Sequence, residues 1–81
     1  MINNIVLTGY YNGIEKGNLL LKISVIENPQ IVKILINKSI RKEIEKRFKI
    51  NDLVGIKGHI GIDDANRMII IATNISFLNN K

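Results

Sequence analysis

The chain has 81 residues, of which 46% are hydrophobic and 18 are isoleucine, and it contains no cysteine. This length allows one hydrophobic core, so we expect a single domain over residues 1–81, and the absence of cysteine excludes disulfides and thiolate metal sites. A net charge of +5 favours an anionic partner such as nucleic acid or an acidic protein surface, although the same charge also aids solubility alone.

The N-terminal residues lack the features of a targeting segment. They contain no basic region, no long apolar run and no small-residue cleavage site. No hydrophobic run in the chain has the length needed to cross a bilayer. We therefore expect a cytoplasmic protein without a membrane partner.

Three strands are predicted in the first half of the chain. The first covers residues 2–10 and is followed by an Asn- and Gly-rich loop over residues 11–18. The second covers residues 19–27, and an Asn-Pro pair separates it from the third, over residues 30–37. The break is short, so we expect the second and third strands to pair in one antiparallel sheet.

One helix is predicted next, over residues 39–49. Ile40, Ile44 and Phe48 recur on one stripe, and Ser39 is the predicted N-cap. The basic residues on its outer face alternate with Glu43 and Glu45, a pattern typical of a solvated helix surface, so we leave the helix outside the candidate site. These basic residues are Arg41, Lys42, Lys46, Arg47 and Lys49.

Two further strands complete the pattern. Residues 53–62 alternate between apolar and polar positions, residues 63–66 form a polar turn, and residues 68–78 form the last strand. The order is three strands, a helix too short for a parallel crossover, and two strands. This all-β order predicts a five-stranded OB-fold barrel with one short helix between strands 3 and 4.

The strand pattern also predicts which side chains face the barrel interior. Glycines at positions 9, 55, 58 and 61 lie where a strand bends or admits a neighbouring backbone. The outer faces are expected to carry Leu20, Ile26, Ile31, Leu35 and Ile70. The predicted interior residues are Leu19, Leu21, Ile23, Val25, Val32, Ile34, Ile36, Val54, Ile56, Ile60, Ile62, Ile69, Ile71, Ile75 and Phe77.

Three segments carry a resemblance to a known family. Residues 3–9 form a short apolar run ending in Gly, residues 50–58 place a turn before a Val-x-Ile-x-Gly pattern, and residues 71–78 end in a Phe-Leu pair. In this order and spacing they resemble the bacterial single-stranded-DNA-binding proteins, and also chains related to the primosomal replication protein N. The resemblance implies an OB fold, single-strand binding without a cofactor, and a homodimer or homotetramer.

The chain departs from the family pattern in several places. The connection between the second and third strands has shrunk to residues 27–30, there is no tryptophan, and no acidic tail follows the last strand. The resemblance places Ile31 where the family carries a base-stacking Trp, Lys33 where it carries a basic residue, and Asn37 where it often has Phe.

The candidate nucleic-acid site lies on the outer face of the second and third strands with its flanking loops. Lys22 and Lys33 are expected side by side there, and the rings of Tyr10 and Tyr11 are expected to divide between base stacking and barrel packing. His59 is interpreted as a surface residue. The predicted site residues are Tyr10, Tyr11, Lys16, Lys22, Ile31, Lys33, Leu35, Lys57 and Arg67.

Two other functions compete with single-strand binding. An enzyme needs a nucleophile with its base, paired carboxylates in a cleft or a metal cluster. The chain offers one His and the adjacent Asp63 and Asp64 in a turn, so we expect neither catalysis nor a metal site. The stronger rival is a protein-interaction or oligomerisation module, because the predicted outer faces are more apolar than those of a solvated monomer.

Overall fold

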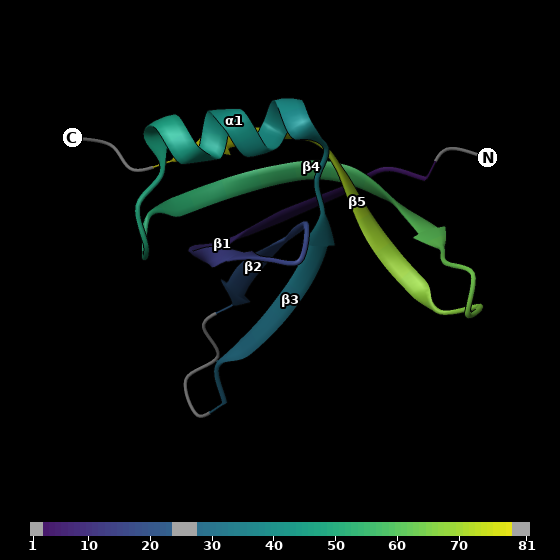
Figure 1. The fold of residues 1–81 in the computed structure, drawn as a ribbon. Helices are drawn as coiled ribbons and strands as arrows, with labels where there is room; N and C mark the ends of the chain where they lie inside the picture. The colour runs from purple at the N-terminus through teal and green to yellow at the C-terminus, as the bar shows by residue number, and fades with distance from the viewer. Residues whose placement is uncertain (1–2, 24–27, 79–81) are drawn as a thin grey trace.

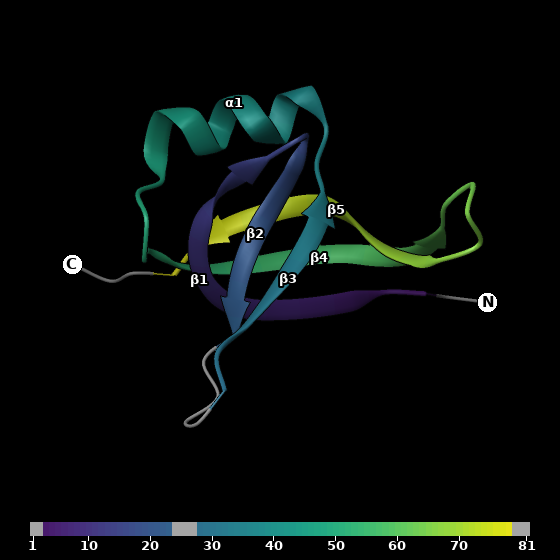
Figure 2. The same ribbon diagram turned by 60° about the horizontal axis from the view of Figure 1, so that its bottom comes forward.

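The protein is a closed five-stranded barrel with one helix across its end. The computed structural model describes residues 3–23 and 28–78. Figures 1 and 2 show the barrel from two directions, with its strands in the order β1-β2-β3-β5-β4. The predicted element order and fold class are confirmed. The elements are β1 (Ile5–Glu15), β2 (Asn18–Ile23), β3 (Gln30–Leu35), α1 (Lys38–Arg47), β4 (Leu53–Ile62) and β5 (Met68–Phe77).

Strand β1 is longer than predicted and pairs with two other strands. Its first half pairs with β4 from Ile5 to Tyr10, and its second half pairs with β2 from Tyr10 to Glu15. The predicted loop over residues 11–18 is wrong, because the chain reverses in two residues. Lys16 and Gly17 have φ values of 51° and 79°, the left-handed conformation that a two-residue hairpin turn requires.

Gly9 lies where β1 passes from β4 to β2. A Cβ atom at this position would lie 2.8 Å from the carbonyl oxygen of Lys22 and 2.9 Å from Cγ of Leu21. The backbones approach too closely there for any side chain, so the predicted role of this glycine in admitting a neighbouring strand is confirmed.

A β-bulge in β5 changes which of its residues face the core. Lys57 pairs with Asn74 but Gly58 pairs with Ala72, which leaves Thr73 as an extra residue. The bulge turns Ile70 and Ala72 inward and leaves Ile69 and Ile71 on the other face, opposite to the prediction. A Cβ atom on Gly58 would overlap the carbonyl oxygen of Ile71 beside this bulge.

The tip of the β4–β5 hairpin extends past the barrel. Ile62 is 69% exposed there, so its predicted interior position is wrong. Phe77 was also predicted inside, but it lies 40% exposed at the end of the barrel beneath α1. Val25 and Ile26 lie outside the described residues. The buried core consists of Tyr11, Leu19, Leu21, Ile34, Ile40, Ile44, Val54, Ile56 and Ala72.

Helix α1 closes one end of the barrel with its apolar stripe. Ile40 and Ile44 are buried, and the ring of Phe48 lies edge-on to Phe77 with centroids 5.7 Å apart. The N-cap is Asn37, whose side-chain oxygen accepts a hydrogen bond from the backbone N–H of Ile40 at 2.8 Å. Ser39 therefore lies inside the helix, and the predicted cap was wrong.

Barrel closure depends on a short parallel seam between β3 and β5. Two residue pairs form it, Ile34 with Ile70 and Leu35 with Ile71. The remainder of β3, from Gln30 to Lys33, faces the β4–β5 hairpin without pairing to it. This separation leaves room for a groove. In the described ranges 3–23 and 28–78, no helix is long and apolar enough to cross a membrane.

Candidate nucleic-acid interface

A groove lies between β3 and the part of the β4–β5 hairpin formed by its turn and the first residues of β5. Its volume is about 490 Å³. Lys33 comes from β3, and Arg67 comes from the turn that connects β4 to β5, so the two cations line the same hollow. Both polar and apolar side chains line it. The lining residues are Asn18, Lys33, Leu35, Asp63, Arg67, Met68, Ile69 and Ile70.

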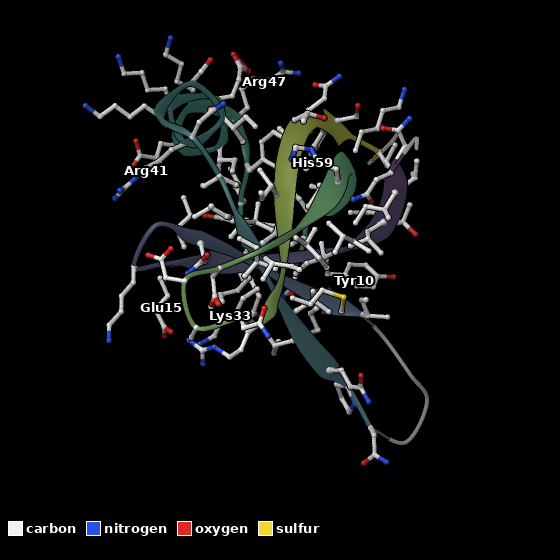
Figure 3. The ribbon with its side chains drawn as sticks, turned by 90° about the vertical axis from the view of Figure 1, so that its right-hand side faces the viewer. Tyr10, Glu15, Lys33, Arg41, Arg47 and His59 are labelled. Atoms are coloured by element: carbon white, nitrogen blue, oxygen red, sulfur yellow. The ribbon has the colours of Figure 1, made fainter. Side chains whose placement is uncertain are left out.

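Lys33 has an amine that is available to a ligand. Its side chain is 67% exposed, and its Nζ lies 3.8 Å from Oε1 of Glu15 (Figure 3). An ion pair at this distance and exposure contributes little stability, so a phosphate is able to replace the carboxylate.

Asp63 fixes the turn that carries Arg67. Its Oδ1 accepts hydrogen bonds from the backbone N–H groups of Ala65 and Arg67, both at 2.9 Å, and its Oδ2 lies 3.4 Å from Nε of Arg67. The backbone hydrogen bond from Arg67 is the main cause that holds the pKa of Asp63 below its ordinary value. Asp63 is thus a structural carboxylate, and its neighbour Asp64 is exposed beside it.

A second set of predicted residues forms a row across three strands. Tyr10 pairs with Lys22, and Lys22 pairs with Ile31, so their side chains share the outer face. Tyr10 is 38% and Ile31 46% exposed. Lys33 pairs with Leu20, which makes Lys22 and Lys33 diagonal neighbours on this face instead of directly opposed residues.

The two adjacent tyrosines have different environments. Figure 3 shows the Tyr10 ring on the barrel surface, whereas Tyr11 is 9% exposed and lies edge-on to Phe48 with centroids 6.3 Å apart. Burial, followed by the charge of Glu45, raises the pKa of the Tyr11 hydroxyl. Tyr11 is therefore a packing residue, and Tyr10 is the ring that a ligand is able to reach.

The remaining predicted residues lie at different distances from the groove. Leu35 lines it, and Lys16 lies in the turn next to Asn18. Lys57 lies elsewhere, opposite Val6 and Asn74 on β1 and β5, where it lines a separate hollow of about 360 Å³. His59 is half-buried opposite Ile71.

Five groove residues were absent from the predicted site: Asn18, Asp63, Met68, Ile69 and Ile70. The sequence pattern places Asn18 in a loop and Met68 in the last strand, with no sign that either lines a groove. Ile69 was assigned to the interior because the bulge at Thr73 leaves no mark in the apolar pattern. The one signal in the sequence for Met68 was its position next to Arg67.

The sequence matches no protein-family model and no curated protein. Solved structures are similar over nearly the whole chain. The mitochondrial single-stranded DNA binding protein Rim1 of S. cerevisiae superposes with a TM-score of 0.76 at 9% identity, covering 98% of this chain and 97% of that one. The N-terminal domain of the PriB protein from Thermoanaerobacter tencongensis, described as dimeric, gives 0.70 at 17% identity, with 96% and 98% covered.

A third similar structure is the SSB domain of a Synechococcus protein, with a TM-score of 0.67 at 14% identity and with 93% and 94% of the two chains covered. The chain has an OB fold of this type. In the OB fold, the outer face of the second and third strands lies between two hairpin loops. Here these loops are the turn at Lys16 and Gly17 and the turn at residues 63–67, so the groove occupies that position.

Proposed function

We propose that this protein binds single-stranded nucleic acid, DNA or RNA, without strong sequence preference, through the outer face of β2 and β3 and the adjacent groove. The observation that carries the proposal is the placement of Lys33 and Arg67 in one groove with apolar Leu35, Ile69 and Ile70. Similar structures described as single-stranded DNA binding proteins support it. Such an activity fits replication, recombination or repair.

The proposed contacts divide into two kinds. Lys22, Lys33 and Arg67 bind phosphates, while Tyr10 and the apolar Ile31 provide surfaces for bases. Every base has a flat face, and phosphate contacts carry no sequence information. The combination therefore selects single strands over duplexes without reading a sequence.

Titration of a labelled oligo-dT, with a duplex of the same length for comparison, tests this function. Replacing Lys33 by Glu should weaken binding to all sequences alike and reduce the salt slope by at least about 0.7, the value for one phosphate contact on a single strand. Lys57→Glu is the matched control, because it makes the same charge change at an exposed position that lines a different hollow. Equal losses for the two variants would contradict the proposed groove.

The alternative function is a protein-interaction or oligomerisation module. Ile62 and Met68 pair across the β4–β5 hairpin and are 69% and 70% exposed, so they form adjoining apolar surface that a second molecule is able to cover. We propose self-association into a dimer or tetramer alongside strand binding. A chain that self-associates but ignores oligo-dT at physiological salt would favour the alternative.

A further inference from the structure

The positive charge of this chain is concentrated away from the groove. Residues 38–49 contain six basic and two acidic residues, so this stretch carries four of the five net positive charges. All other residues together contain six basic and five acidic residues. The attraction for a polyanion is therefore strongest at α1 and its exit.

The lysines of α1 form a single stripe on the side away from the barrel. Ile40 and Ile44 are buried against the core, and Lys38, Lys42 and Lys46 recur every four residues on the opposite, exposed side. Lys49 continues this series just after the helix and is also exposed. We name these four residues the lysine stripe.

The carboxylates of the helix are occupied by arginines on its flanks. Nε of Arg41 lies 3.5 Å from Glu45, and NH1 of Arg47 lies 3.1 Å from Glu43. Figure 3 shows the two arginines on opposite sides of the helix. Among residues 3–23 and 28–78, no carboxylate forms an ion pair with the lysine stripe.

The lysine stripe begins beside one end of the groove. Leu35 and Asn18 line the groove, and the backbone N–H of Ile36 donates a hydrogen bond to the carbonyl of Gly17 at 3.4 Å. This contact places the turn that carries Lys16 next to the start of α1, as Figure 2 shows. Lys16 therefore lies between the groove that Lys33 lines and the start of α1 at Lys38.

We propose that the lysine stripe is a second binding surface for the phosphate backbone, which the single strand reaches when it leaves the groove past Lys16. This inference rests on the proposed function and extends its site. A helix rises about 6 Å in four residues, close to the span of one nucleotide in an extended strand. Lysines four residues apart also repel one another, and bound phosphates relieve that repulsion.

The test uses two double variants on the same helix. Lys42→Gln with Lys46→Gln removes two charges from the lysine stripe, whereas Arg41→Gln with Arg47→Gln removes two charges from the ion-paired flanks. Both pairs lower the net charge equally and keep good helix formers. Each protein is titrated across a salt series with an oligo-dT of about 6 and one of about 16 nucleotides, lengths within the range of OB-fold sites. Circular dichroism verifies the fold.

We expect the lysine pair to weaken binding of the long oligonucleotide by on the order of tenfold, to reduce its salt slope by about 1.4, and to leave the short one nearly unchanged. The arginine pair should change the slope for the long oligonucleotide far less. Equal effects of the two pairs, or no effect of the lysine pair, would contradict the proposal that the lysine stripe binds the phosphate backbone.

A third double variant, Lys22→Gln with Lys33→Gln, separates this inference from the proposed function. If this groove pair weakens binding and the lysine pair does not, the result supports the proposed groove and contradicts binding at the lysine stripe. If the lysine pair weakens binding and the groove pair does not, the result supports binding at the lysine stripe and contradicts the proposed groove. A wild-type protein that binds neither oligonucleotide overturns both.

Discussion

Tyr10 and Tyr11 are adjacent in the chain but have opposite surroundings. Tyr10→Ala should keep the melting temperature and lose about tenfold in affinity for oligo-dT, because stacking on an exposed ring contributes on the order of 1 to 3 kcal/mol per base. Tyr11→Ala should lose about 3 to 5 kcal/mol of folding stability, because its ring packs on Phe48 in the core. Thermal melts and titrations of both variants measure the two effects. A Tyr10→Ala protein with unchanged affinity would remove stacking from the proposed site.

The raised pKa of the Tyr11 hydroxyl predicts a loss of stability at high pH. Burial and the charge of Glu45 raise its pKa in the folded protein above the ordinary value of about 10. The unfolded chain then releases this proton at lower pH than the folded protein does. The free energy of unfolding should therefore fall as the pH rises from about 10 through the raised pKa.

Chemical denaturation across this pH range measures that loss, with Tyr11→Phe as the reference, since it removes the hydroxyl and keeps the ring. The difference between wild type and Tyr11→Phe isolates Tyr11 from the titration of the lysines. In Tyr10→Phe, Tyr11 becomes the only tyrosine, so phenolate absorbance reports its pKa directly. A midpoint at or below the ordinary value would contradict the assignment.

At the residue scale, strand alternation predicted that one tyrosine packs and one faces the ligand, but did not identify which. The distinction depends on Phe48, which follows Tyr11 by 37 positions and reaches its ring only because α1 covers the barrel end. Such a contact leaves no local pattern. Lys33 and Leu35, in contrast, were placed on the outer face by alternation alone, and the groove contains both.

The N-cap of α1 is a feature of the element that a substitution pair is able to test. Asn37→Ala should destabilise the protein by about 1 kcal/mol, because the N–H of Ile40 loses its hydrogen-bond acceptor. Ser39→Ala should have little effect, since Ser39 lies within the helix. Denaturant midpoints compare the two variants, and a larger loss for Ser39→Ala would place the cap at the residue that the sequence suggested.

The lysine stripe predicts a conflict between stability and binding within α1. Lys42→Glu replaces two repulsive contacts, with Lys38 and Lys46, by two attractive ones and adds one repulsive contact with Glu45, so it should stabilise the helix by a few tenths of a kcal/mol at low salt. The same change should weaken binding of a long oligonucleotide. Melting curves at low and high salt measure the first effect, which added salt should diminish. A destabilised Lys42→Glu protein would show that this lysine makes a favourable contact in the fold.

At the element scale, the sequence predicted strand bounds best where apolar and polar residues alternate regularly. Strand β4 begins and ends where its alternation predicted, at Leu53 and Ile62. Strand β5 was found, but the bulge at Thr73 reversed the faces of Ile69, Ile70 and Ile71. Three consecutive isoleucines fit either face equally well, and the partner strand alone decides between them.

Self-association is the prediction that belongs to the whole molecule. Ile62 and Met68 pair across the tip of the β4–β5 hairpin and are both about 70% exposed, so they form an apolar patch that a second copy is able to cover. Ile70 no longer belongs to the predicted outer surface, because it packs against the core. Ile62→Lys with Met68→Lys should shift the protein towards monomer in sedimentation experiments. A monomeric wild type at high micromolar concentration would contradict the assembly.

The architecture of the whole molecule followed from the order of its elements, because three strands, a short helix and two strands leave few ways to close a sheet. The groove did not follow from that order. It exists because β3 and β5 pair over two residues and then diverge, and this divergence depends on how strongly each strand coils.

The same seam has a consequence for how the barrel forms. β1, β2 and β3 are joined by short connections, and so are β4 and β5, so each group can assemble from contacts that are near in sequence. The parallel contact between β3 and β5 spans 36 residues and has two residue pairs to offset the entropy of that closure. We expect it to form last on folding and to separate first when the native protein opens locally, with the backbone amides along it exchanging with solvent deuterium sooner than those shared by β1 and β4.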